Sequence, residues 1–239
     1  MQRTPEGTTI SALADSDLDV RKSLAGQMGW THGELLTRMS LLLIVEGEHD
    51  RLVLETLFGQ RLREVGVTII RMHGTPNLLA TAEMDFIERH FDVPVGVLLD
   101  FVRLERVDGN TPPESLTQEE NALRYFRRAC HRRSREVSDF GLKRPDIVAY
   151  LNEDAIRVRW PEFVGWGAVL RKFHAKSTRP SFKPWLKEHY AVDLTRIDRI
   201  GEVLQHMADN ELPVAGELAK VVRQIELTAS EGRWPSEGS

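Results

Sequence analysis

Short aliphatic runs that end at an acidic residue most constrain the fold of this chain. LLLIV (41–45) is followed by Glu46, and VPVGVLL (93–99) is followed by Asp100. A third run, VTIIRM (67–72), is rich in β-branched residues, which favour strands. The unbroken aliphatic run at 41–45 is typical of a strand that is covered on both faces of a sheet.

Helical patterns separate these runs. After the run at 41–45, apolar residues recur at spacings of three and four, at Leu54, Leu57, Phe58 and Leu62. After the run at 67–72, Thr75-Pro76 is a typical helix start. The alternation predicts an α/β fold with a mainly parallel sheet of about four strands flanked by helices. Because ligands bind at the carboxyl ends of such strands, we expect Glu46 and Asp100 to converge.

The chain divides into four predicted segments. They are a polar arm with a weak helix at 1–38, the α/β core at 39–135, a mainly helical extension at 136–227 and a loose tail at 228–239. Within the extension, helices are predicted over 182–190, 200–210 and 217–227, whereas 146–151 suits either a strand or a short helix.

Composition excludes several classes of protein. The net charge of −4 gives no global basic signature, so any nucleic-acid contact must come from a local patch. The single cysteine, Cys130, excludes an intrachain disulfide framework and a cysteine-based zinc site. No apolar run approaches the ~20 residues that span a bilayer. We therefore expect a cytoplasmic protein with no membrane segment.

The segment IVEGEHDRLVL (44–54) resembles the opening motif of TOPRIM domains. The matching residues are Glu46, Gly47, Asp50 and Leu54, in a strand–turn–helix context. Gly74 with Asn77-Leu78 and the segment VGVLLD (95–100) resemble the later TOPRIM motifs. LTQEENAL (116–123) resembles the acidic segment of the nuclease half of OLD-family (overcoming lysogenisation defect) proteins.

This resemblance implies a TOPRIM-like, Rossmann-like core and phosphodiester chemistry with Mg²⁺ or Mn²⁺. Glu46 would be a metal ligand or a general acid/base, Asp50 and Asp100 would be metal ligands, and Glu120 a further ligand. OLD-like nucleases also use a downstream lysine, for which Lys176 and Lys183 are the candidates. The chain departs from the family at Val102, where the DxD motif would place a second aspartate.

Structural roles compete with these assignments. Asp50 suits a cap on the helix that follows it, and Asp100 suits a solvated acid at a strand end. Thr117 and Glu120 have the spacing of a capping box, which predicts a helix from Thr117. Both interpretations of each acid remain open.

That helix has a basic stripe. Its arginines follow one another at helical spacing: Arg124, Arg127, Arg128, Arg132 and Arg135. Guanidinium groups pair well with phosphates, so the stripe predicts contact with a nucleic-acid backbone. The alternative is a solvated face that is paired with acids elsewhere in the chain.

Two functional hypotheses follow. The first is metal-dependent hydrolysis of DNA phosphodiesters, in phage defence or DNA repair. The second is a degenerate TOPRIM module that binds nucleic acid or a partner without cutting, a hypothesis that Val102 keeps open. Full OLD-family proteins also carry an ATPase domain, and this sequence has no G-x-x-x-x-G-K-[ST] phosphate loop, so the chain would act alone or with a separate ATPase or helicase partner. A homodimer is a further assembly that we consider.

Overall fold

The computed structural model describes residues 2–4, 7–9, 39–71, 94–132, 137–176 and 180–231. The chain forms two units, one from residues 1–38 and 80–92 and the other from 39–79 and 93–239. In the first unit the described residues are two antiparallel strands, β1 (Gln2–Thr4) and β2 (Gly7–Thr9). The rest of the polar arm and the helix expected after Thr75 lie outside the described residues. All other described residues belong to the second unit.

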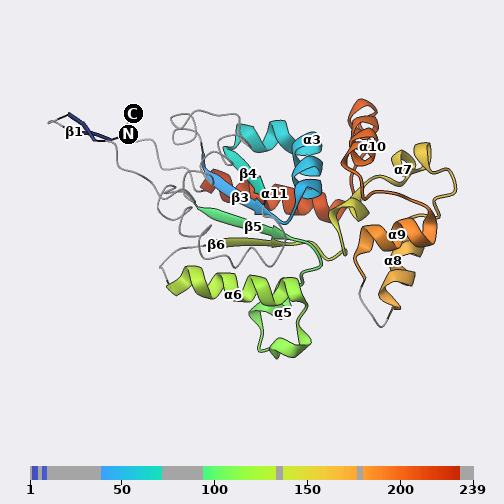
Figure 1. Cartoon of the computed structure of the whole chain (residues 1–239), viewed down its shortest axis with the longest axis horizontal. Helices are drawn as coiled ribbons and strands as arrows, with labels where there is room; N and C mark the ends of the chain where they lie inside the picture. Colours follow the sequence, from blue (N-terminus) through green and yellow to red (C-terminus); the bar gives the residue numbers. More distant parts are fainter. Residues whose placement is uncertain are drawn as a thin grey trace. The chain divides into compact units, whose positions relative to one another are not determined.

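A four-stranded parallel sheet forms the centre of the second unit (Figure 1). Its order is β4-β3-β5-β6, with bounds β3 (Leu41–Val45), β4 (Val67–Arg71), β5 (Val95–Leu99) and β6 (Val137–Gly141). All three pairings are parallel, and every residue of β3 and β5 is buried. This confirms the predicted α/β fold with a mainly parallel sheet.

The fourth strand lies beyond the predicted core boundary at residue 135. β6 has the sequence VSDFG, and only Phe140 within it is fully buried. As an edge strand it pairs on one side only, so it needs no aliphatic run and gives none of the signal that marked the inner strands.

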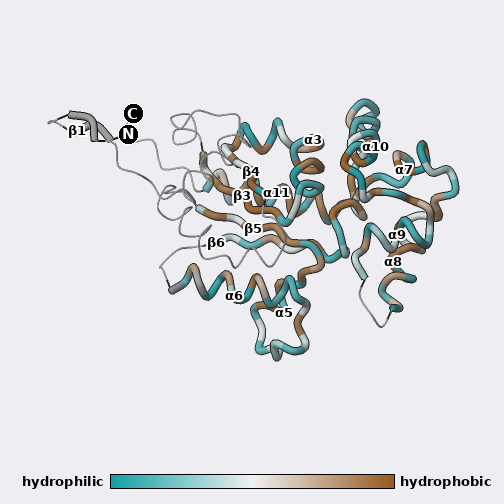
Figure 2. Tube along the Cα trace, viewed as in Figure 1, coloured by the Kyte–Doolittle hydropathy of each residue, from teal (hydrophilic) through white to brown (hydrophobic). Residues whose placement is uncertain are grey.

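Alternate side chains of β3 point to opposite faces of the sheet. Leu41, Leu43 and Val45 pack in one large core with α3 (Glu48–Glu64) and α11 (Gly216–Glu231). Helix α6 (Gln118–Arg132) contacts β6 and buries the apolar face that the sequence predicted, including Cys130. Figure 2 shows the same division, with hydrophobic strands inside and mixed helices around them.

The C-terminal part is mainly helical, as predicted. It comprises η3 (Ile147–Tyr150), α7 (Glu153–Arg159), α8 (Trp166–His174), α9 (Phe182–Tyr190), α10 (Ile197–Asp209) and α11. The predicted helix at 182–190 is confirmed with the same bounds. Helix α11 continues to Glu231, into the segment predicted as a loose tail, and residues 232–239 lie outside the described residues. In the described part of the chain no helix is long and apolar enough to span a bilayer.

Candidate functional site

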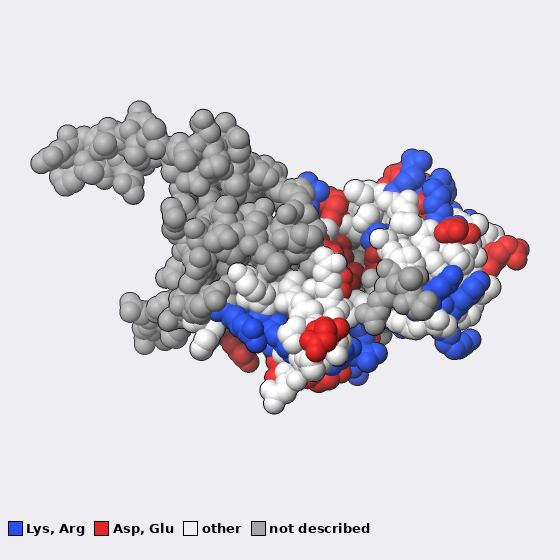
Figure 3. Space-filling view, turned by 60° about the horizontal axis from the view of Figure 1, so that its bottom comes forward, with Lys and Arg blue, Asp and Glu red and all other residues white. Residues whose placement is uncertain are grey.

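A cleft of about 650 Å³ opens at the carboxyl ends of the parallel strands. Glu46, directly after β3, and Asp100, directly after β5, both line it. Asp50 joins them from the first turn of α3. In Figure 3, acidic atoms gather in the hollow near the centre of the face, with basic groups on the surface around it. The three acids predicted to form one site therefore share one cleft.

Asp146, a fourth acid in the cleft, was not predicted. It follows β6 in the loop before η3, and its Oδ1 accepts a hydrogen bond from the Val148 amide at 3.1 Å. The next amide along the same turn, that of Ile147, donates to Asp100 Oδ2 at 2.8 Å. One short 3₁₀ turn thus holds both carboxylates side by side. The available sequence signal was an acid preceded by Pro145 and followed by the apolar segment 147–151.

Lys183 enters the same cleft from α9 and forms an ion pair with Asp146. Its side chain is only one-fifth exposed. Lys176, the other predicted lysine, is exposed and does not line the cleft. Of the two candidates, the structure brings only Lys183 to the acids.

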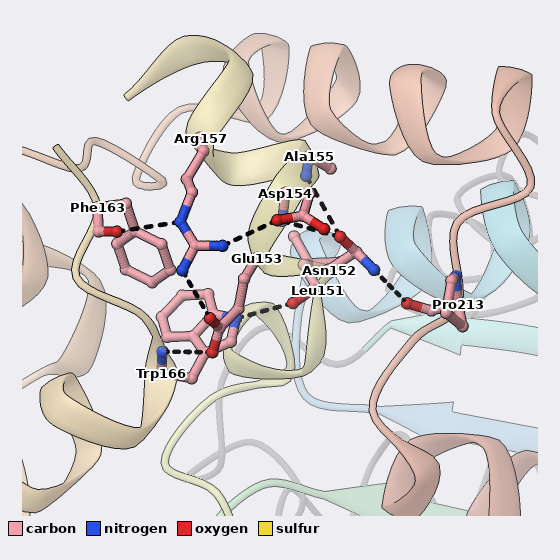
Figure 4. A network of polar contacts seen from close by, with 9 residues as sticks. All are labelled: Leu151, Asn152, Glu153, Asp154, Ala155, Arg157, Phe163, Trp166 and Pro213. Carbon is pink, nitrogen blue, oxygen red and sulfur yellow. Dashed lines mark hydrogen bonds and ion pairs between the residues drawn. The ribbon is translucent and has the colours of Figure 1, made fainter. Parts of the chain in front are cut away.

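A polar network joins the residues around α7 to the start of α8, the helix that packs against α9 (Figure 4). Glu153 accepts hydrogen bonds from Arg157 Nη2 at 2.9 Å and from the Trp166 amide at 2.8 Å. The Trp166 indole donates to the Leu151 carbonyl, also at 2.8 Å. These contacts hold the start of α8.

Aromatic packing then joins α8 to α9. The ring of Phe173 on α8 lies 5.0 Å from that of Phe182 and 5.0 Å from that of Trp185, both edge-to-face. Edge-to-face pairs prefer a defined geometry and stabilise beyond simple burial. Because Lys183 follows Phe182 directly, this packing sets the direction from which the ammonium group reaches the cleft.

The acids of the cleft lie close to one another and are largely buried from solvent. Burial, together with the charge of Asp146, raises the pKa of Asp50 to about 7. Burial and the charges of Asp50 and Asp146 raise the pKa of Asp100 well above its ordinary value. Burial alone would lower the pKa of Lys183, but Asp146 and the neighbouring acids raise it overall. Among the described residues that line the cleft, the acids outnumber the cationic side chains of Arg71 and Lys183, a situation that a bound cation would relieve.

Two further nitrogen groups line the cleft. Among the described residues, His49 Nε2 and Arg71 Nε are buried without a hydrogen-bond partner. Burial and the charge of Lys183 lower the pKa of His49, which favours its neutral form. Arg71 keeps one ion pair, to Glu48 at 2.8 Å. Neither residue was assigned to the site from the sequence.

The capping alternatives describe real contacts. Asp50 Oδ2 accepts a hydrogen bond from the Gly47 amide at 2.7 Å, so Asp50 both caps α3 and lines the cleft. Glu120 Oε2 accepts from the Thr117 amide at 2.9 Å, and Thr117 Oγ1 accepts from the Glu120 amide at 3.0 Å. Glu120 is 1% exposed, its other oxygen accepts from the Arg103 amide, and it does not line the cleft. The capping box accounts for Glu120 without a metal.

Val102 points away from the cleft. It is 1% exposed, and its carbonyl and methyl group lie against Gly141 of β6. Phe101, which precedes it, has a positive φ of 57° and breaks the regular alternation of the chain after β5. An aspartate at position 102 would therefore enter the core in this fold, and Asp146 supplies the additional carboxylate instead.

Some arginines of the basic stripe form hydrogen bonds and ion pairs within the chain. Arg124 donates to backbone carbonyls around α5 (Leu104–Asp108), including those of Arg106 at 2.9 Å and Thr111 at 2.7 Å. Arg127 forms ion pairs with Asp108 and Asp139. Arg128 is exposed. The side chain of Arg132 and all of Arg135 lie outside the described residues.

The donor set fits a hard divalent cation. Carboxylate oxygens from Glu46, Asp50, Asp100 and Asp146 are the ligands that Mg²⁺ and Mn²⁺ prefer. Burial, followed by the charges of Asp50 and Asp146, raises the pKa of Asp100. Within the described ranges, however, no three Asp, Glu, His or Cys side chains already form a group that could hold a metal ion. Binding would therefore need the carboxylates to adjust.

No family model matches this sequence, and no curated protein matches it either. Among solved structures, the chain is similar to the C-terminal region of the OLD protein of Xanthomonas campestris pv. campestris. The platinum-phased structure is 19% identical, with 81% of this chain and 91% of that chain covered and a TM-score of 0.37. The mercury-phased structure is 18% identical, with 82% and 98% covered and the same TM-score. Similarity at this level assigns no residue role.

Proposed function

We propose that the chain is a nucleic-acid protein whose acidic cleft supports metal-dependent hydrolysis of DNA phosphodiesters. The observation that carries the proposal is that four carboxylates and one partly buried lysine line one cleft at the carboxyl ends of parallel strands. The resemblance of 44–54 to the TOPRIM motif supports the same reading. A bound Mg²⁺ or Mn²⁺ would supply Lewis-acid stabilisation of charge on the phosphate oxygens.

The residues of the chain divide into two roles. Glu46, Asp50, Asp100 and Asp146 would hold the cation, and Glu46, the acid of the TOPRIM motif, would also act as a general acid/base. Lys183 and Arg71 would bind phosphate oxygens, since both are cations inside an otherwise acidic cleft. In the ranges that the structure describes, the buried Nε of Arg71 has no hydrogen-bond partner.

The alternative is a module that binds without cutting. It is favoured by the absence, within the described part of the chain, of a ready-made metal-binding group and by the pairing of Lys183 with Asp146. A phage-defence or DNA-repair role, a separate ATPase or helicase partner and a homodimer belong to this proposal as its biological setting.

Plasmid nicking in Mg²⁺ and in Mn²⁺ tests the proposal. We expect wild-type cleavage to fall by roughly 100-fold or more in Glu46→Gln, Asp100→Asn and Lys183→Gln, because each removes a group at the reacting phosphate. Lys176→Gln is the matched control, since Lys176 is exposed and outside the cleft. Cleavage that survives Glu46→Gln refutes the site, and DNA binding without cleavage selects the alternative.

A further inference from the structure

We propose that the cleft takes an unpaired nucleobase, which stacks on Phe101 beside the acidic cluster, so that the preferred substrate is single-stranded or locally unwound nucleic acid. This inference rests on the proposed function and specifies its substrate. It starts from the partly buried ring of Phe101, which lines the same cleft as Asp100, its neighbour in the chain.

The backbone at Phe101 is held in an unfavourable conformation. Its φ of 57° lies in the left-handed region, which a bulky residue seldom adopts. Two hydrogen bonds maintain it, from the Phe101 amide to the Arg144 carbonyl at 3.0 Å and from the Val102 amide to the Leu142 carbonyl at 2.9 Å. Strain of this kind persists at functional sites, and here it occurs at an aromatic residue that lines the cleft.

A second ring supports the first. His174, at the end of α8, stacks on Phe101 with ring centroids 5.9 Å apart and an angle of 13° between the planes. Phe173 packs edge-to-face against His174 from the buried side of α8. The orientation of Phe101 is therefore set from both the sheet and the helical part, as a stacking surface requires.

The chemistry selects an unpaired base. Bases inside a duplex are already stacked on their neighbours, whereas bases in single strands present a free π-face to aromatic side chains. Stacking accepts any base, so no sequence preference is needed. Two of the described arginines of α6, Arg124 and Arg127, are engaged within the chain, which leaves the exposed Arg128 to contact a duplex backbone.

Fluorescence anisotropy with three labelled probes tests the inference on the full chain, with Ca²⁺ in place of Mg²⁺. The probes are a single strand of about 12 nucleotides, the same strand with abasic sites, and a blunt duplex. We expect the intact single strand to bind most tightly. Phe101→Ala should weaken its binding by about 5- to 150-fold and leave abasic binding unchanged.

Matched variants separate stacking from structural effects. Phe101→Tyr keeps the ring and should bind as wild type, and His174→Ala, on an exposed helix end, should weaken single-strand binding more modestly. Tyr125→Ala removes an exposed aromatic on α6 outside the cleft and should change nothing. If Phe101→Ala weakens abasic and intact strands equally, the ring acts structurally and the inference is overturned.

Cleavage of the same probes in Mn²⁺ separates this inference from the proposed function. Glu46-dependent cleavage with equal rates on intact, abasic and duplex probes would overturn the stacking while the proposed function stands. The absence of both binding and cleavage for all three probes would overturn the proposed function and the inference with it.

Discussion

Replacing Asp50 with asparagine should stabilise the metal-free protein, and the gain should grow with pH. Asp50 is 8% exposed, and burial together with Asp146 raises its pKa to about 7 from an ordinary 3.8. The folded chain therefore holds a proton that the unfolded chain releases between about pH 4 and pH 7. The folded protein loses stability as the pH rises through this window, because ionised Asp50 is less favourable in the buried cleft than in the unfolded chain.

The size of the effect follows from that window. A difference of about three pH units, at ~1.4 kcal/mol per unit, makes Asp50 unfavourable by about 4 kcal/mol near pH 8. Near pH 5 the same linkage gives a destabilisation of the folded protein by Asp50 of only about 2 kcal/mol. Asparagine keeps an oxygen that can accept the Gly47 hydrogen bond of 2.7 Å, so the cap of α3 is preserved. The advantage of Asp50→Asn should thus widen by about 2–3 kcal/mol between pH 5 and pH 8.

Urea unfolding in EDTA, followed by circular dichroism at both pH values, measures this difference. Asp198→Asn is the matched control, since Asp198 is an exposed acid paired with Arg196 at 2.7 Å and should show no such gain. Added Mn²⁺ should stabilise wild type more than Asp50→Asn, because a bound cation favours the ionised carboxylate. Equal stability of Asp50→Asn and wild type at both pH values would refute the proposed crowding of charge.

Two further predictions concern the surroundings of the cleft. Val102→Asp places an acid at a position that is 1% exposed, so we expect the free energy of unfolding in urea to fall by at least ~3 kcal/mol, with no gain of cleavage. A Val102→Asp variant as stable as the wild type would show that position 102 opens to the cleft. Gly165 has a φ of +92°, and a Cβ added there would lie 2.7 Å from Glu153 Oε2, so we expect Gly165→Ala to lower the free energy of unfolding by ~1–3 kcal/mol. Disturbing the network of Figure 4 should also displace Lys183 and weaken nicking, and unchanged nicking would show that the network does not position Lys183.

The inner strands and the three predicted acids were readable because their signals are local. Residues 41–45 are aliphatic throughout and residues 95–99 are aliphatic except for Gly96, a pattern typical of strands buried on both faces, and each segment is followed directly by an acid. Parallel strands bring their carboxyl ends to one edge of the sheet, so pairing alone placed Glu46 and Asp100 in one cleft. Helix α9 was equally legible from its apolar spacing.

Contacts between distant segments were decided only in three dimensions. Asp146 is 37 residues from Lys183 and 47 residues separate Asp100 from Ile147, so no spacing rule could pair them or choose Lys183 over Lys176. Arg124 had the periodicity of a phosphate-binding stripe, yet the fold turned it toward the carbonyls of α5. Val102 faces the core because Phe101 adopts a positive φ, a backbone choice that depends on hydrogen bonds to Arg144 and Leu142. Periodicity tells which residues share a face, but only packing determines what that face meets.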